Sequence, residues 1–297
     1  MTADDENPPA ADSYVDARCA AVYDIFEGPE RDDLDVYAAM VEEFGAASVV
    51  DVGCGTGTFA TMLAGRGVEV VGVDPSALAL NVARTKPNSD QVTWVHGVAA
   101  DLPPLQVDIA FMTANVAQEI LGAEKWSETL LAIRRILRPG GLIVFESRIP
   151  EREAWLEWTK ENTYSVAEVD GEGTVESWVE YEASYGGFVD FIGVLVFERD
   201  GRRVEQRSWL QFRDRDELTK SLEDTGFNVE EIRDAPDRPG REFVFIARKG
   251  KYPYRRDVDL DKMDLVPQEL GRHLARADGR RIVRAGLISD SQPYRPS

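Results

Sequence analysis

Short apolar runs alternate with helix-patterned segments in the first half of the chain. The runs are rich in Val, Ile and Phe, and they cover residues 47–52, 68–73, 92–96, 107–112 and 142–147. Continuous runs of this kind are typical of strands buried on both faces of a parallel sheet.

Two segments between or before these runs carry the spacing of an amphipathic helix. Leu34, Tyr37, Val41 and Phe44 repeat every three or four positions and end at Gly45. The segment from Glu124 to Leu137 shows the same spacing and stops before a Pro-Gly-Gly sequence. Alternating helices and buried strands predict a Rossmann-like, doubly wound α/β fold with a mostly parallel sheet.

The pattern changes after Pro150. A polar helix around Trp155 and Trp158 is expected first, followed by three longer alternating runs at residues 174–184, 188–198 and 203–213. Gly-Gly and Asp-Gly turns separate these runs, so they predict an antiparallel β flap attached to the parallel sheet. A helix at 214–225 and strands at 227–232 and 242–248 then complete seven strands, the last of them antiparallel.

These patterns divide the chain into three parts. Residues 1–45 are expected to form an N-terminal helical lid. Residues 46–250 form the main domain, with the insertion at about 150–213. Residues 251–297 lack a clear period and are expected to be a peripheral tail.

Composition excludes several classes of protein. The chain has 297 residues, a 43% hydrophobic share and no apolar run of membrane-spanning length. Its net charge of -20 repels nucleic acid phosphates. The acidic N-terminus lacks the basic and apolar regions of a signal peptide, so a cytoplasmic location is expected, with Cys19 and Cys54 as free thiols.

The strongest local motif follows the first strand. It reads Asp51-Val52-Gly53-Cys54-Gly55-Thr56-Gly57, with three glycines at alternate positions before a helix. A dinucleotide-binding loop would need its third glycine where Thr58 stands. The segment instead resembles the first motif of class I S-adenosylmethionine-dependent methyltransferases of the small-molecule type. This resemblance implies S-adenosylmethionine as methyl donor, with the methionine part bound by Asp51, Gly53, Cys54, Gly55 and Gly57.

Later segments agree with the same family. Asp74-Pro75 follows the second strand, where the resemblance implies a carboxylate that binds the ribose; an Asp there could also cap the next helix, although Ser76 is available for that. Leu137-Arg138-Pro139-Gly140-Gly141 matches the sequence that precedes the fifth strand in the family.

The adenine site departs from the family pattern. Val98 occupies the position where an acidic residue usually binds the adenine amino group. Either the backbone of Val98 and Ala99 or the side chain of Asp101 is then expected to bind the adenine. Tyr23, in a Tyr-Asp pair on an N-terminal helix, is expected either to cover the cofactor or to pack that helix down.

The acceptor should bind beyond the carboxyl ends of strands four and five, beneath the flap. The candidates that face it are Asn115, Gln118, Arg148, Trp178 and Tyr181, and Asn115 also stands near the expected cofactor. Arg148 could bind an acceptor carboxylate or phosphate, or pair with an acid such as Glu151. Methyl transfer needs alignment and exclusion of water more than a special nucleophile, so no catalytic residue is assigned and no metal is expected.

The sequence thus predicts a methyltransferase that transfers a methyl group to an N, O or C atom of a small molecule by in-line displacement. Residues 113–116 lack the motif that stacks on a flipped nucleic acid base. Two alternatives are a nicotinamide-dependent oxidoreductase and a non-catalytic S-adenosylmethionine-binding protein. The oligomeric state is not indicated.

Overall fold

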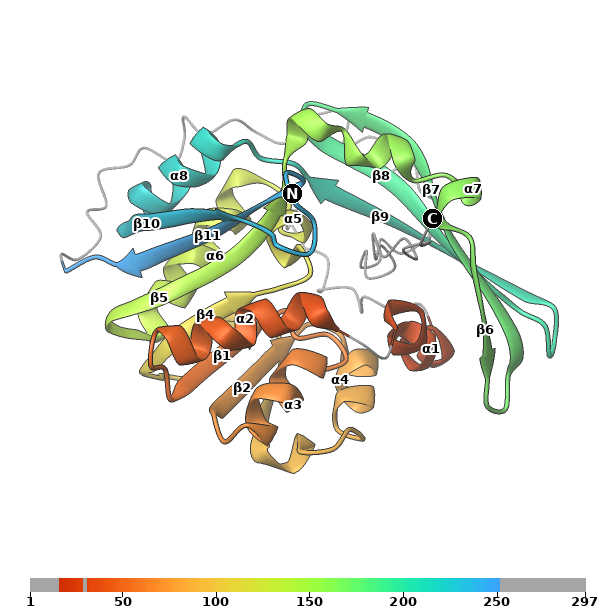
Figure 1. Cartoon of the computed structure of the whole chain (residues 1–297), viewed down its shortest axis with the longest axis horizontal. Coiled ribbons are helices and arrows are strands. Elements are labelled where there is room, and N and C mark those ends of the chain that lie inside the picture. Colours follow the sequence, from red (N-terminus) through yellow and green to blue (C-terminus); the bar gives the residue numbers. More distant parts are fainter. Residues whose placement is uncertain (1–15, 29–30, 252–297) are drawn as a thin grey trace, which may run out of the picture.

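The computed structural model describes residues 16–28 and 31–251, and these form two sheets. The larger sheet has seven strands in the order β10-β11-β5-β4-β1-β2-β3, and the smaller sheet has four (Figure 1). The expected tail therefore lies, apart from Lys251, outside the described residues, as do residues 1–15 of the expected lid.

The seven-stranded sheet confirms the Rossmann-like prediction. Only β11 runs antiparallel to its neighbours, and it lies between β5 and β10. β1 and β4 are parallel neighbours at the point where the strand order reverses. Their carboxyl ends therefore meet where ligands bind in open α/β sheets. The strands are β1 (Ser48–Val52), β2 (Glu69–Asp74), β3 (Val92–His96), β4 (Val107–Met112), β5 (Leu137–Arg148), β10 (Phe227–Asp234) and β11 (Glu242–Lys249).

Helices cover both faces of this sheet. On one face, α2 (Asp32–Glu43) and α3 (Thr58–Gly65) bury apolar side chains such as Tyr37 and Phe59 against β1 and β4. On the other face, α6 (Ala123–Ile136) and α8 (Arg215–Asp224) pack Trp126 and Leu222 against β5 and β11. The other described helices of the domain are α1 (Ala17–Glu27), α4 (Ala77–Ala83), α5 (Val116–Glu119) and the short 3-10 turns η1 (Ser89–Gln91) and η2 (Ala99–Asp101).

The insertion after β5 confirms the predicted antiparallel flap, which forms a sheet of its own, here called the inserted sheet. It differs from the expected details in two ways. It has four strands, because β6 (Ser165–Val169) pairs with β7 (Gly173–Tyr185) beside β8 (Phe188–Phe197) and β9 (Arg202–Gln211). In place of one polar helix stand η3 (Pro150–Arg152), η4 (Ala154–Glu157) and α7 (Lys160–Thr163), because Trp155 and Trp158 pack on the inserted sheet at its root.

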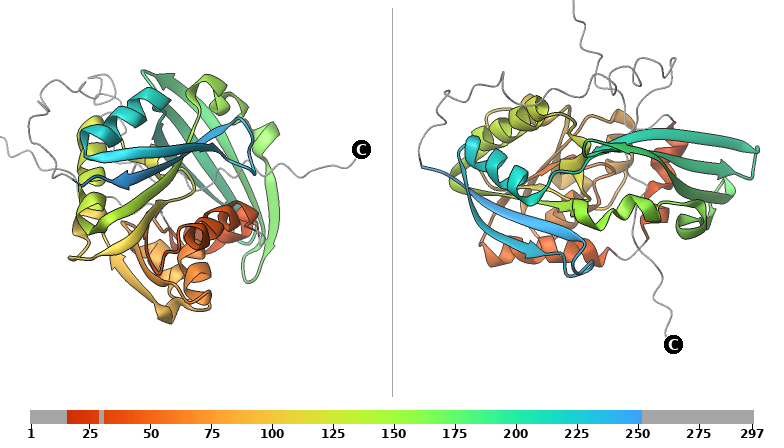
Figure 2. Two further views of the ribbon diagram at one scale, coloured as in Figure 1. Left: turned by 60° about the vertical axis from the view of Figure 1, so that its left-hand side comes forward. Right: turned by 90° about the horizontal axis from the view of Figure 1, so that it is seen from above.

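The inserted sheet projects from one side of the main domain and curves over α1 (Figures 1 and 2). On its inner face, Val175 and Phe197 pack against Cys19 and Val22 of α1. At the strand tips Arg18 forms ion pairs with Glu172 and Asp200. The insertion therefore holds α1 next to the carboxyl ends of the strands.

Among the helices of residues 16–28 and 31–251, none combines the length and the apolar character that a membrane crossing requires.

Candidate functional site

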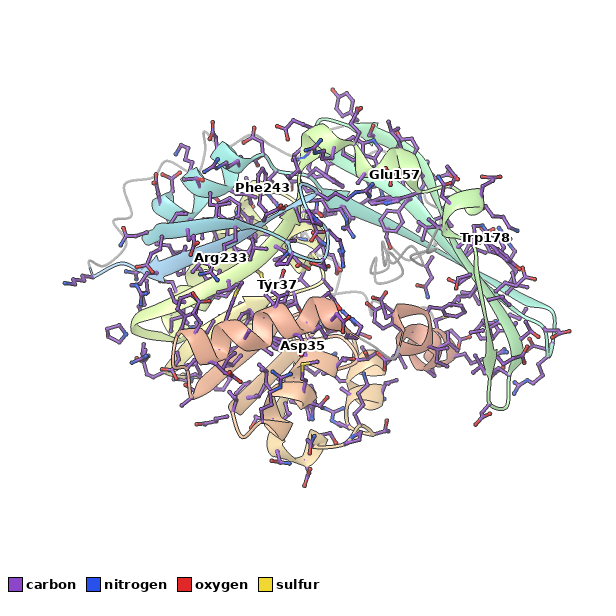
Figure 3. All side chains as sticks on the ribbon, viewed as in Figure 1. Asp35, Tyr37, Glu157, Trp178, Arg233 and Phe243 are labelled. Atoms are coloured by element: carbon purple, nitrogen blue, oxygen red, sulfur yellow. The ribbon has the colours of Figure 1, made fainter. Side chains whose placement is uncertain are left out.

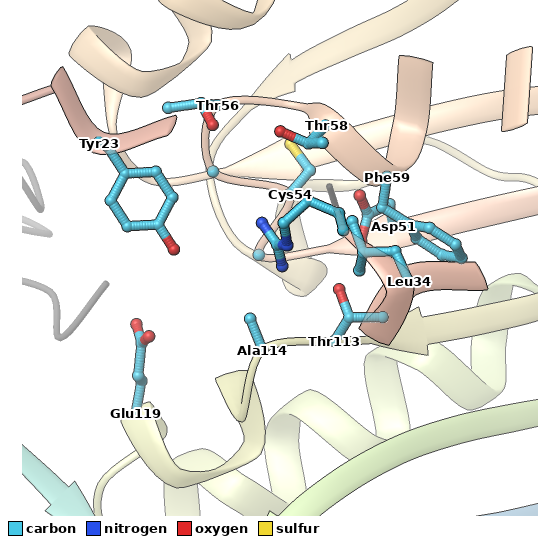
Figure 4. A pocket seen from close by; sticks show the side chains of 13 residues that line it. Tyr23, Leu34, Asp51, Cys54, Thr56, Thr58, Phe59, Thr113, Ala114 and Glu119 are labelled. Atoms are coloured by element: carbon cyan, nitrogen blue, oxygen red, sulfur yellow. The ribbon is translucent and has the colours of Figure 1, made fainter. Parts of the chain in front are cut away.

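A pocket opens at the carboxyl ends of β1 and β4, beside α1 and the start of α2 (Figure 4). It holds about 520 Å³ of space not filled by atoms, part of it open to solvent. Its walls combine predicted and unpredicted residues: Tyr23, Arg31, Leu34, Asp51, Gly53, Cys54, Gly55, Thr56, Thr58, Phe59, Thr113, Ala114 and Glu119. Five of the eleven predicted cofactor residues thus meet at one pocket.

The glycine turn forms one wall. Gly53, Gly55 and Gly57 have φ angles of 73°, 55° and 79°, in the left-handed region that side chains disfavour. At Gly57 a Cβ atom would lie 2.5 Å from the Trp94 ring, so only glycine fits there. The turn exposes backbone to the pocket because no side chain stands at these positions.

Asp51 lies at the floor of the pocket, on β1, with 1% of its surface exposed. An ionised carboxylate in such a place must be compensated by positive charge or donors. Asp51 therefore lines the pocket, and its contact with the cofactor stays a prediction.

Asp74 and Pro75 do not line this pocket. The Asp74 side chain is fully buried; Gly55 N donates to its Oδ2 at 2.7 Å and Ser76 N donates to its Oδ1 at 2.8 Å. Asp74 therefore ties the glycine turn to the end of β2, while Ser76 caps α4 by accepting from Ala79 N. Binding of ribose by Asp74 stays a prediction.

The residues predicted to read adenine also lie outside the pocket. Val98 is 45% exposed, and its backbone N–H donates to Asp101 Oδ2 at 2.8 Å. Ala99 is buried. The two groups proposed to bind adenine in place of the missing acidic residue, the Val98 backbone and the Asp101 side chain, are thus hydrogen-bonded to each other.

α1 is anchored to the glycine turn by a small ionic cluster. Asp24 accepts from Thr56 Oγ1 at 2.6 Å, and its other oxygen lies 2.6 Å from Lys86 Nζ. Lys86 also donates to Thr58 Oγ1 at 2.6 Å. The neighbouring Tyr23 points into the pocket, opposite Glu119 of α5 (Figure 4). These contacts place the predicted lid residue in the pocket wall.

Arg31 is a pocket residue that the sequence reading missed. It lies just before α2, and its guanidinium donates to both carboxylate oxygens of Asp33 at 2.9 and 2.8 Å. Glu27 lies 3.9 Å from it, and burial raises the pKa of Glu27 to about 7. No periodicity marks Arg31, because it stands in the irregular link between two helices.

Three of the five acceptor candidates come together behind the pocket. Asn115, Gln118 and Arg148 are all buried, and Arg148 donates from Nη1 to Gln118 Oε1 at 3.2 Å. Ala114 and Asn115 both have positive φ angles, 54° and 59°, at the end of β4. Consecutive left-handed residues other than glycine are strained, and such strain gathers at functional sites.

The other two candidates are separated by the pleat of β7. Tyr181 lies on the face that packs against Trp158, whereas Trp178 lies on the opposite face. There Lys160 Nζ stacks on the Trp178 ring at 3.7 Å and Glu180 accepts from its indole N–H; Figure 3 shows it at the outer edge of the inserted sheet. The structure therefore does not bring Trp178 to Asn115.

Two buried carboxylates complete the site and were also missed. Glu146 accepts from Asn115 N at 3.0 Å and from the Tyr37 hydroxyl, and burial raises its pKa to about 7. Glu242 accepts from Asn115 Nδ2 at 3.0 Å and from Arg238 at 2.9 Å. The available signal was an acid within the apolar strand β5 and another at the start of the apolar strand β11, since buried acids usually serve a specific purpose.

Both cysteines are free, as predicted. Both are also buried, and Cys54 contributes to the pocket wall. Within residues 16–28 and 31–251, no three His, Cys, Asp or Glu side chains are grouped so that they could hold a metal ion.

Comparisons with known proteins agree with this geometry. Residues 49–141 match the family model of a methyltransferase domain. Malonyl-[acyl-carrier protein] O-methyltransferase of Pseudescherichia vulneris is 31% identical over 144 residues, which are 46% of this chain and 55% of that protein. The chain therefore spans about half the length of this relative.

Two solved structures share the fold across most of the chain. The CcbJ methyltransferase of Streptomyces caelestis has a TM-score of 0.64 at 24% identity and covers 78% of this chain and 96% of its own. CalS10, an amino pentose methyltransferase of Micromonospora echinaspora, was solved with S-adenosylmethionine bound. It has a TM-score of 0.62 at 20% identity, and the match covers 80% of this chain and 98% of CalS10. Residues 49–141 thus match a methyltransferase domain, and the chain shares the Rossmann-like fold of these solved methyltransferases.

Proposed function

We propose that the protein transfers the methyl group of S-adenosylmethionine to an N, O or C atom of a small molecule. The observation that carries the proposal is the pocket itself, in which a glycine turn, a buried acid and a partly buried arginine meet at the carboxyl ends of β1 and β4. S-adenosylmethionine supplies a methyl carbon activated by a positively charged sulfur.

The charges of the pocket fit the amino acid end of this cofactor. Asp51 offers a carboxylate for its ammonium group, and Arg31 offers a guanidinium for its carboxylate. The turn at Gly53 and Gly55 lets the backbone approach without steric conflict. Opposite charges on one ligand, matched by opposite charges in one pocket, support a zwitterionic amino acid group over a pyrophosphate.

The surrounding elements support a closed reaction site. α1, held by Asp24 and Lys86, covers one side of the pocket and acts as the proposed lid. A water-poor site favours methyl transfer because alignment and exclusion of water contribute most of the acceleration. The net charge of -20 supports a small-molecule acceptor over a nucleic acid, and a cytoplasmic location remains part of the proposal.

Thermal-shift titration with S-adenosylhomocysteine tests the cofactor site, with NAD as the competing ligand. A hundredfold excess over the dissociation constant should stabilise the native chain by about 2.7 kcal/mol. Asp51→Asn, which removes the charge but keeps the shape, should abolish most of this shift. Asp90→Asn, a matched change at an exposed position, should keep it.

Two results would contradict the proposal. A shift with NAD alone would favour the oxidoreductase alternative. Equal shifts for Asp51→Asn and Asp90→Asn would place the ligand elsewhere. Transfer of a labelled methyl group to compounds of low mass then separates an enzyme from a non-catalytic binding protein.

A further inference from the structure

Five buried side chains form a connected group behind the pocket, here called the inner polar cluster: Asn115, Gln118, Arg148, Trp158 and Glu242. None has more than 4% of its surface exposed. Asn115 Nδ2 donates to Glu242 Oε1 at 3.0 Å, and Arg148 Nε lies 3.8 Å from the same oxygen. Arg148 also donates to Gln118, and its guanidinium carbon lies 5.6 Å from the centre of the Trp158 ring.

Four polar atoms of this cluster are buried without a hydrogen-bond partner among the described residues. Two are acceptors, Asn115 Oδ1 and Glu242 Oε2, and two are donors, Gln118 Nε2 and Trp158 Nε1. Each such atom costs about 1–3 kcal/mol, so native proteins rarely retain one without a reason. Four of them in one cluster indicate that a ligand completes it.

The positions of these atoms specify the chemistry of that ligand. The two free acceptors belong to residues that bond each other, so they require hydrogen-bond donors at one end of the ligand. The two free donors belong to residues that contact Arg148, so they require an oxygen near its guanidinium, which favours a negatively charged one. The ligand therefore carries a donor at one end and an oxygen at the other.

The cluster adjoins the pocket through two chain neighbours. Ala114 and Glu119 line the pocket, and they directly precede Asn115 and directly follow Gln118. The left-handed turn at Ala114 and Asn115 is held by Glu146, which accepts from Asn115 N at 3.0 Å. A ligand in the cluster would thus lie next to the proposed cofactor site.

We propose that the inner polar cluster binds the methyl acceptor, a small molecule that presents an amine or hydroxyl to Asn115 and Glu242 and a carboxylate or similar oxygen to Gln118, Trp158 and Arg148. This inference rests on the proposed function, because it assigns the acceptor of that same reaction. The amine or hydroxyl is the group that receives the methyl.

The step balances with the groups present. The lone pair of the acceptor nitrogen or oxygen forms a bond to the methyl carbon, and the carbon–sulfur bond breaks with its electron pair left on sulfur. The proton lost from the acceptor passes to Glu242 Oε2, one of the two unpartnered oxygens of the cluster. Glu242 is in this way the base that the sequence did not reveal.

Three matched probes test the chemistry: trans-4-aminocyclohexanecarboxylate, which has both groups, and cyclohexylamine and cyclohexanecarboxylate, which have one each. They are titrated by ligand-observed NMR into the full chain loaded with S-adenosylhomocysteine. The bifunctional probe should bind at least tenfold more tightly than either of the others.

Variants assign the two ends of the ligand. Glu242→Gln should remove the advantage that the amine gives, and Trp158→Phe should weaken both probes that carry a carboxylate. Glu128→Gln, a matched change on the exposed surface of α6, should change nothing. All three variants should bind S-adenosylhomocysteine like the native chain, which also shows that they are folded.

The outcomes separate the two proposals. Failure of the native chain to bind S-adenosylhomocysteine refutes the proposed function. Normal binding of S-adenosylhomocysteine, with no binding of the bifunctional probe or equal binding of all three probes, refutes the acceptor assignment alone. The acceptor assignment is also refuted if Glu242→Gln binds the three probes like the native chain. The unpartnered atoms of the cluster would then be satisfied by water and not by the acceptor.

Discussion

Glu146 should make the stability of this protein fall as the pH rises through the weakly acidic range. Its carboxyl is buried between β5, Tyr37 and the Asn115 turn, and burial, reinforced by the charge of nearby Glu242, raises its pKa from 4.5 to about 7. In the unfolded chain the same group returns to its ordinary pKa. Between these two values the folded protein holds a proton that the unfolded chain releases.

The sign and size follow from proton linkage. Below pH 4.5 both states are protonated and the group contributes no penalty. From pH 4.5 to 7 the free energy of unfolding falls by about 1.4 kcal/mol per pH unit, and the loss reaches about 3 kcal/mol. Above pH 7 both states are ionised, so the penalty is constant.

Urea unfolding of the native chain and of Glu146→Gln, at pH 5 and at pH 8, measures this effect. Glu27 titrates in the same range, but it is present in both proteins and cancels in their difference. The stability of the native chain relative to the variant should drop by about 2–3 kcal/mol between the two pH values. A difference that stays constant within 0.5 kcal/mol would mean that Glu146 is ionised throughout (~0.5 kcal/mol being the scatter of surface substitutions).

Three further predictions concern single contacts. Lys86→Met breaks the ion pair with Asp24 that anchors α1, so affinity for S-adenosylhomocysteine should fall and amide hydrogen exchange in α1 should rise. Unchanged hydrogen exchange in α1 would count against an anchoring role. Arg213→Met leaves buried carbonyls such as that of Ala117 unpaired and should cost about 3 kcal/mol in urea unfolding; a loss below about 1 kcal/mol would contradict this. Phe145→Ala removes a ring that stacks on Phe245 at 5.2 Å and should cost about 3–5 kcal/mol in the same assay, a smaller loss showing that the core can close the cavity.

The seven-stranded sheet could be predicted because its strands are buried on both faces. Such strands need continuous apolar sequence, as in residues 107–112, and that pattern is visible without tertiary information. The position of β11 between β5 and β10 left no local signal, since strand order depends on contacts between distant segments.

The insertion was predicted less completely for a physical reason. β6 is half exposed at the edge of its sheet, so it lacks the strict alternation that marks the other three strands. The region of Trp155 and Trp158 showed helical spacing, but both rings pack against Phe212 at the root of the inserted sheet, and tertiary packing overrides the local preference.

The candidate site was predictable to a similar extent. Asp51 and the glycine turn could be proposed as cofactor residues because the proposed roles require fixed residue types at fixed spacing. Arg31 and Glu242 were missed because they reach the site from a link and from the last strand, far from the motif in sequence. Trp178 was misplaced because aromatic residues in a strand can serve either face, and only the register of β7 decides between them.

A crystal structure of the full chain with S-adenosylhomocysteine tests the central claim most directly. The account predicts that the ligand's ammonium group contacts Asp51, its carboxylate contacts Arg31, and its sulfur lies between the glycine turn and the Thr113–Ala114 segment. Electron density for the ligand outside this pocket, or inside it with Asp51 and Arg31 both facing away, would contradict the account.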